Sequence, residues 1–221
     1  MEASVSGEQT GAARWLSVHD DLLRGLTHAL SNRVGTLSAV AYMVEMQPAT
    51  VGASVATLRA EAERLEAVLQ LMRLLPRKAD ATAEPVIPTD TTTQAVALQS
   101  YHPNLGDVAV VVTLDGDLQP AYADPAVLVM AVTLILGAAQ RAVRGAGRVD
   151  VTISSSTEVV RIRACGVGVD GTPGHADADS ARDVDAVNWL LAPFDGSGAP
   201  DAAGAVVSIP TLQAARRARH G

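Results

Sequence analysis

Cysteine, aromatic side chains and basic charge are all scarce in this chain of 221 residues. Its single cysteine excludes an internal disulfide framework and a zinc site made of cysteines. Aromatic residues are 3% of the total, so Ala, Val and Leu carry most of the 48% hydrophobic content, and such small side chains suit closely packed helices. The 17 basic residues are outnumbered by 24 acidic ones, and the net charge of −7 argues against a nucleic-acid-binding surface.

Long hydrophobic runs are missing as well. The longest, residues 126–139, is shorter than the roughly 20 residues that a membrane helix needs. Residues 1–11 are polar and lack the apolar run of a signal peptide. We therefore expect a cytoplasmic protein without a membrane segment. Cys165 lies in an apolar strand pattern and is interpreted as a buried small hydrophobe, and the basic cluster at 216–219 as a solvated tail.

Heptad repeats dominate the first third of the chain. In residues 12–47, apolar side chains recur every seven residues at Leu16, Leu23, Leu30, Leu37 and Val44. A segment with Pro48 and Gly52 interrupts the pattern, which resumes over 53–75 with Leu58, Leu65 and Met72. Two such helices form an antiparallel hairpin with one bare apolar flank, and two hairpins can cover it in a four-helix bundle. The sequence therefore predicts a homodimer.

The pattern changes after a linker rich in Pro and Ala at 76–88. The periodicity predicts helices and strands in alternation; the helices are 90–100, 124–143 and 183–192, and the strands 108–114, 148–154, 159–165 and 204–209. Asp124 and Pro125 mark the start of the most apolar helix. We predict an α+β fold, in which a dimerisation and phosphotransfer hairpin (12–76) precedes an α/β sandwich (89–212) with helices on one face of a largely antiparallel sheet.

His28 is the candidate reactive residue. With the Leu16/Leu23/Leu30 series at heptad position a, His28 falls at position f, far from the apolar seam, and so faces solvent. A neutral imidazole is a competent nucleophile near neutral pH, and an exposed one can be approached in line by a phosphoryl donor. Asn32, one turn further, can hydrogen-bond a phosphoryl oxygen, and Arg24 and Arg33 can neutralise its charge. An ordinary surface histidine is the alternative.

His19 is the rival acceptor, because the acidic Asp20 follows it. It falls at position d of the same register, partly inside the bundle, and lacks a polar residue four places on. We interpret it as a packed core histidine.

The segment LTHALSNRV, residues 26–34, resembles the H-box of sensor histidine kinases, with His28 at the phosphorylated histidine and Asn32 at the polar residue four places on. The second half resembles the kinase ATPase domain of the GHKL type, with helix 124–143 in place of the N-box and strand 159–165 before the G1-box. The order of hairpin, linker and sandwich covers nearly the whole chain.

Three departures from the kinase pattern stand out. Gly137 replaces the N-box Asn that holds Mg²⁺, Gly166 replaces the G1-box Asp that reads adenine, and Ala29 replaces the acidic residue after the histidine. The chain is thus similar to the histidine phosphotransferases of the ChpT type, which keep a helical bundle and a degenerate ATPase-like domain. This resemblance implies transfer without autokinase or ATPase activity.

By this resemblance, His28 relays a phosphoryl group between aspartates of response-regulator receiver domains in a bacterial two-component phosphorelay. The partners implied are receivers and a hybrid histidine kinase, with no nucleic acid or membrane. No cofactor or metal site of the chain's own is expected, because the receiver supplies Mg²⁺. Two alternatives stay open: a non-catalytic pseudokinase that docks response regulators, and a divergent histidine kinase.

Overall fold

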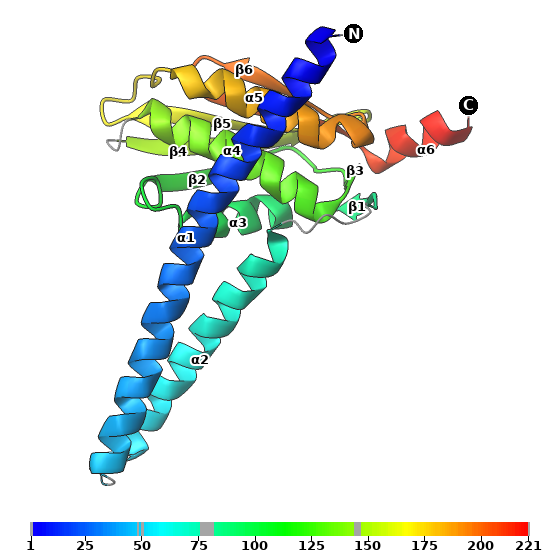
Figure 1. Cartoon of the computed structure of the whole chain (residues 1–221). Coiled ribbons are helices and arrows are strands. Elements are labelled where there is room, and N and C mark those ends of the chain that lie inside the picture. The colour runs from blue at the N-terminus through cyan, green and yellow to red at the C-terminus, as the bar shows by residue number, and fades with distance from the viewer. Residues whose placement is uncertain (1, 48, 50, 76–81, 144–146, 221) are drawn as a thin grey trace.

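Two long helices lead into an α/β body. The computed structural model describes residues 2–47, 49, 51–75, 82–143 and 147–220. Helices α1 (Glu2–Met46) and α2 (Val51–Leu74) form a hairpin whose tip projects away from the body (Figure 1). Helix α1 begins well before the predicted residue 12. Residues 76–81 of the predicted linker lie outside the described residues.

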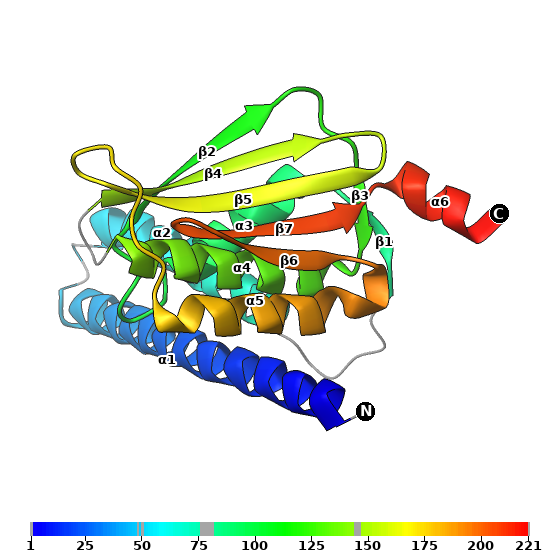
Figure 2. The same cartoon turned by 90° about the horizontal axis from the view of Figure 1, so that it is seen from above.

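Helix α1 has two packing partners along its length. Its first half lies along α5 of the body, and its second half against α2 (Figures 1 and 2). The side chains that the first half buries are Trp15, Val18, Leu22 and Leu26. The predicted seam is therefore wrong by one residue at Leu16 and Leu23, which are 59% and 36% exposed, whereas Leu26, at an intermediate position of the same heptad pattern, is buried as predicted. The heptad count assumed one partner helix throughout, whereas the body fixes the register of this half.

The body is a five-stranded sheet with helices on one face. The strand order is β2-β4-β5-β7-β6; β2 and β4 are parallel and the other neighbours antiparallel, so the predicted largely antiparallel α+β arrangement is confirmed. Figure 2 shows α4 and α5 on the same side of the sheet. The strands and helices of the body have the following bounds: α3 Pro88–Gln99, β2 Ala109–Asp115, α4 Pro125–Ala142, β4 Gly147–Ser155, β5 Val159–Gly168, α5 Ala178–Leu191, β6 Ser197–Asp201 and β7 Gly204–Pro210.

Helix α4 is the centre of the core. Asp124 caps it, with its Oδ1 accepting from the amides of Ala126 and Val127 at 3.0 and 3.1 Å, as the sequence predicts. The helix is long and apolar enough to cross a membrane, yet 78% of it is buried between the sheet and the neighbouring helices. Its hydrophobicity is therefore that of a core helix. Cys165 is buried beside it, as predicted.

Several short elements differ from the sequence prediction. The predicted linker contains β1 (Glu84–Val86), which pairs with β3 (Ala121–Ala123), and α3 already begins at Pro88. The predicted strand 159–165 and helix 183–192 are both longer, because β5 runs to Gly168 and α5 begins at Ala178.

The end of the chain is also more ordered than expected. The predicted tail is helix α6 (Leu212–His220), in which Arg217 pairs with Glu158 at 2.6 Å and Arg219 lies 4.8 Å from the ring centre of Tyr122. Two basic side chains thus take part in contacts rather than extending freely into solvent.

Candidate phosphotransfer site

His28 lies on the middle of α1, at one wall of a cleft of about 640 Å³. Its side chain is exposed, as predicted, although the seam from which it was counted is displaced in this half of α1. The cleft brings together all four side chains that the sequence analysis selected, which are Arg24, His28, Asn32 and Arg33. The opposite wall is the connection from α3 to β2, here called the 100–107 loop.

Asn32 holds the imidazole ring of His28. Its Nδ2 amide donates to His28 Nε2 at 3.2 Å, one helical turn away. A neutral imidazole that accepts at Nε2 carries its proton at Nδ1, so Nε2 is the nitrogen with the lone pair. Nε2 is therefore the nucleophilic atom in this arrangement, and the amide of Asn32 is already within reach of any group that attaches there.

The two arginines of the site differ in how firmly they are held. Arg24 is 72% exposed and has a surface ion pair with Asp21 at 3.4 Å. Such a pair is worth little, so Arg24 can turn to an incoming anion at small cost. Arg33, in contrast, reaches α2 and pairs with the buried Glu61 at 3.1 Å. Burial acts to raise the pKa of Glu61, but the hydrogen bonds and charges of Arg64 and Arg33 outweigh burial and hold it below its ordinary value.

The 100–107 loop approaches α1 unusually closely. A Cβ at Gly25 would overlap the carbonyl oxygen of Tyr101 and lie 2.8 Å from its carbon, so only glycine fits there. The loop is itself tightly turned, with the carbonyl of His102 accepting from the amides of Leu105 and Gly106 at 3.3 and 3.1 Å. Since Gly25 is three residues before His28 on the same helix face, this contact sets the width of the cleft.

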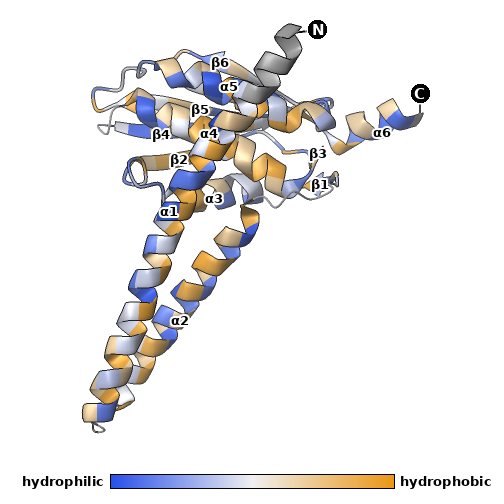
Figure 3. Cartoon of the chain, in the orientation of Figure 1, coloured by the Kyte–Doolittle hydropathy of each residue, from blue (hydrophilic) through white to orange (hydrophobic). Residues whose placement is uncertain are grey.

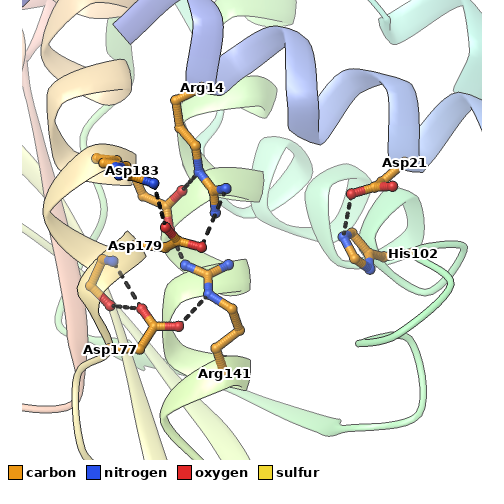
Figure 4. Close-up of polar contacts among 9 residues, drawn as sticks. Arg14, Asp21, His102, Arg141, Asp177, Asp179 and Asp183 are labelled. Carbon is orange, nitrogen blue, oxygen red and sulfur yellow. Dashed lines mark hydrogen bonds and ion pairs between the residues drawn. The ribbon is translucent and has the colours of Figure 1, made fainter. Parts of the chain in front are cut away.

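His102 is the loop residue that faces α1. Its Nδ1 accepts from the amide of Asn104 at 3.2 Å, and its Nε2 lies 3.8 Å from a carboxylate oxygen of Asp21 (Figure 4). Burial lowers the pKa of His102, and the nearby Arg141 and Arg14 add to this effect against the opposing charge of Asp21. His102 is therefore neutral at pH 7. The sequence places His102 in a loop before Pro103, but no local pattern connects it to His28.

His19 is half-buried on the same helix, as predicted. Its ring meets Trp15 edge-on with 6.1 Å between ring centres, and its Nδ1 lies 3.5 Å from Asp20. It is not among the residues that line the His28 cleft.

Gly137 and Gly166, the two positions that the kinase resemblance assigns to nucleotide binding, lie away from this cleft, on α4 and on β5 beside it. A Cβ at Gly166 would overlap the carbonyl oxygen of Ala139 and lie 2.9 Å from Val143 Cγ1 and 3.2 Å from Ala142 Cβ. No aspartate can therefore be accommodated at Gly166 without moving α4. The loop that follows is bonded to the end of α4, with the amide of His175 donating to the carbonyl of Ala142 at 3.1 Å.

An ion cluster lines a cavity of about 200 Å³ beside Gly137. Asp183 of α5 is buried and receives hydrogen bonds from Arg14 of α1, at 2.6 Å, and from Arg141 of α4 (Figure 4). Arg141 also donates to Asp177 at 2.8 Å. Burial lowers the pKa of Arg141, but the charges and hydrogen bonds of Asp183 and Asp177 outweigh it and raise the pKa above its usual value. This cluster was not predicted, because its members are far apart in the sequence.

No protein-family model matches the chain, and no curated protein shows significant sequence similarity to it. Among solved structures, full-length ShkA in complex with AMPPNP aligns with a TM-score of 0.44 and 18% identity, over 88% of this chain but only 46% of ShkA. A bacterial phosphotransferase aligns at 0.44 with 15% identity over 87% and 95% of the two chains. The Acinetobacter baumannii histidine kinase AdeS aligns at 0.43 with 15% identity over 83% and 96%. Because these scores and identities are low, we base the function on the residues of this chain.

Proposed function

We propose that the chain is a histidine phosphotransferase of a bacterial two-component phosphorelay. A phosphoryl group passes from the aspartate of one receiver domain to His28 and from His28 to the aspartate of a second receiver. The observation that carries this proposal is the cleft itself, in which an exposed imidazole has an amide and two guanidinium groups around it. The resemblance of residues 26–34 to a kinase H-box supports it independently.

The transfer step fits the protonation of His28. The lone pair of Nε2 attacks the phosphorus, the P–O bond to the receiver's aspartate breaks, and the carboxylate leaves with the electron pair. The proton on Nδ1 stays in place, so the phosphorylated ring is cationic and no base is needed. The second transfer reverses these bond changes on another aspartate. Asn32 must release Nε2 before attack, and its amide is then free to donate to a phosphoryl oxygen.

Charge stabilisation in the cleft falls mainly to Arg24. Arg24 is exposed and held only by a surface pair, so it can turn toward the phosphoryl group. Arg33 is engaged with Glu61 and contributes its charge from a fixed place. We propose that Mg²⁺ comes with the receiver and that the chain needs no cofactor of its own.

Loss of nucleotide chemistry is consistent with this role. Gly137 and Gly166 supply no group to hold metal or adenine, and the packing around Gly166 leaves no room for a side chain. A chain that receives its phosphoryl group from a receiver has no need of ATP. We therefore propose that it lacks autokinase and ATPase activity.

The hairpin also supports the proposed homodimer. Apolar residues alternate with polar ones along both helices (Figure 3). Beyond residue 30, the large exposed ones are Val34, Tyr42, Met43 and Met46 on α1 and Val51, Val55 and Leu69 on α2. A second hairpin would bury this surface in a four-helix bundle.

The test is to incubate the protein with a phosphorylated receiver and to assay acid-labile phosphate on the chain. We expect label on wild type and on His19→Gln, and none on His28→Gln. His28 is exposed, so its replacement should change the free energy of unfolding by less than about 0.5 kcal/mol. Label that survives in His28→Gln and disappears in His19→Gln would refute the assignment. Receiver binding with no label on any variant would favour the pseudokinase alternative.

A further inference from the structure

The ion cluster of Arg14, Asp183 and Arg141 joins three helices at one buried carboxylate. The side chain of Asp183 is 1% exposed, and each of its oxygens accepts from a different arginine (Figure 4). Arg14 also lies 3.7 Å from Asp179. A carboxylate withdrawn from water this completely is tolerated only while its partners remain in place, so the three helices are held in one arrangement.

The surrounding contacts show that this arrangement is specific. Gly11, one turn before Arg14, touches α5 so closely that a Cβ would lie 2.9 Å from Trp189 Cβ and 3.0 Å from the carbonyl oxygen of Asp185. One turn after Arg14, Val18 is buried in the core. Asp177, the second partner of Arg141, is the N-cap of α5 and accepts from the amide of Ser180 at 2.9 Å. The cluster is thus built into the ends of α4 and α5.

Helix α1 transmits this fixed contact to the phosphotransfer cleft. His28 is 14 residues after Arg14, which is about 21 Å along a continuous helix. The other wall of the cleft, the 100–107 loop, belongs to the body that the cluster attaches to α1. A shift of α1 on α5 therefore changes the position of His28 relative to this loop.

We propose that Arg14 and Asp183 are positioning residues for phosphotransfer: their ion pair, together with Arg141, fixes α1 on the body and so sets the geometry of the cleft that a receiver must enter. This inference rests on the proposed function. It gives Arg141, which lies beside Gly137, a role in holding the site of transfer in place.

The experiment compares Arg14→Ala and Arg14→Lys with the wild type, and uses Arg148→Ala as a matched control. Arg148 forms an exposed pair with Asp150 at 2.7 Å, remote from α1. Three quantities are measured on each full-length variant: hydrogen exchange of the amides in 12–30, the transfer rate as a function of phosphorylated receiver concentration, and the labelling of His28 by phosphoramidate. Labelling by phosphoramidate needs no receiver.

For Arg14→Ala we expect faster exchange in 12–30 and a rise of roughly tenfold in the receiver concentration that gives half the maximal rate. Labelling by phosphoramidate should stay within about twofold of the wild type, because Nε2 itself is unchanged. Arg14→Lys keeps the charge and should be intermediate, and Arg148→Ala should match the wild type in all three measurements.

Two results would overturn the proposal. One is faster exchange with an unchanged transfer curve, which would make the cluster merely structural. The other is a loss of phosphoramidate labelling as large as the loss of transfer from the receiver, which would place the effect on His28 itself. If Arg14→Ala does not fold, Arg14→Lys decides by the same comparison. If wild-type His28 is labelled by neither donor, the proposed function fails. Unchanged hydrogen exchange in Arg14→Ala would then separately refute the idea that Arg14 and Asp183 fix α1 on the body.

Discussion

Replacement of Gly25 by alanine should damage the protein, whereas the same replacement at Gly35 should improve it. Both glycines lie inside α1. A Cβ at Gly35 meets no atom within 4 Å, but a Cβ at Gly25 lies 2.8 Å from the carbonyl carbon of Tyr101 and overlaps its oxygen. Two identical changes in one helix therefore separate the intrinsic effect of alanine from the effect of the close contact.

The magnitudes follow from these distances. Alanine in an exposed helix position is more stable than glycine by about 0.5–1 kcal/mol, which is the gain expected for Gly35→Ala. Non-bonded atoms in contact prefer separations of about 3.5–4.0 Å, and the Tyr101 oxygen overlaps the added Cβ even more than the carbon does. Gly25→Ala must therefore push α1 and the 100–107 loop apart by about 1.5 Å. Overpacking of this kind costs about 1–3 kcal/mol or more, which exceeds the helix gain. In a chain of this size each kcal/mol moves Tm by about 2–4 °C.

Urea unfolding of the two variants, followed by circular dichroism, measures both changes. The opposite signs of the two changes in unfolding free energy are the essential result, because an error in the assumed size of either energy cannot reverse a sign. Gly25→Ala should also slow transfer to His28, since the loop forms the other wall of its cleft. Equal stabilisation by both substitutions would show that the loop does not rest on Gly25 and that the described cleft is wrong.

Four further outcomes are expected. Leu69→Glu, at an exposed apolar position of α2, should give a monomer that keeps its helical content, and a monomeric wild type at micromolar concentration by sedimentation would contradict the dimer. Glu61→Gln should lower Tm because Arg33 loses its charged partner, and an unchanged Tm would show that this pair does not hold the hairpin. Titration calorimetry with millimolar Mg-ATP should give no binding heat, whereas micromolar affinity would show that the glycine at 166 does not replace a required group. The pKa of His102 is lowered in the folded protein, so the unfolded chain gains this proton at a higher pH than the folded protein does. The unfolding free energy should therefore drop from pH 7.5 to 5.5, by at most about 1.4 kcal/mol per pH unit, and His102→Asn should flatten this dependence.

Helix α4 and the exposure of His28 could be predicted because their signals are local. Asp124 and Pro125 mark the start of α4 within the sequence itself, and its apolar run gives its length. The exposure of His28 and the position of Asn32 follow from helical spacing alone. Strands β1 and β3 have three residues each, too few for a period to be recognised.

What the sequence could not predict depends on contacts between distant residues. The 100–107 loop reaches His28 only because Gly25 lets Tyr101 approach α1. The displaced seam has a similar origin. Trp15 and Leu22 are buried rather than Leu16 and Leu23, since α5, more than 150 residues later in the chain, covers the first half of α1. A heptad count has no information about a partner helix that is distant in the sequence.

Under the proposed function, the packing around α4 makes the difference from the kinase pattern at 137 and 166 more than a change of two side chains. An aspartate restored at Gly166 would collide with Ala139 and Val143, so the sheet and α4 lie too close for that group to return alone. Arg141, one turn after Gly137, meanwhile directs its guanidinium to Asp183 and Asp177, and those carboxylates leave no charge on it unmatched. The space beside Gly137 keeps a cavity of about 200 Å³, but the nearest cation, Arg141, is already paired with carboxylates and so has little to offer a polyphosphate. The ion cluster is, however, well suited to hold the helices in a fixed relation, which the proposed transfer through His28 between two successive partners requires.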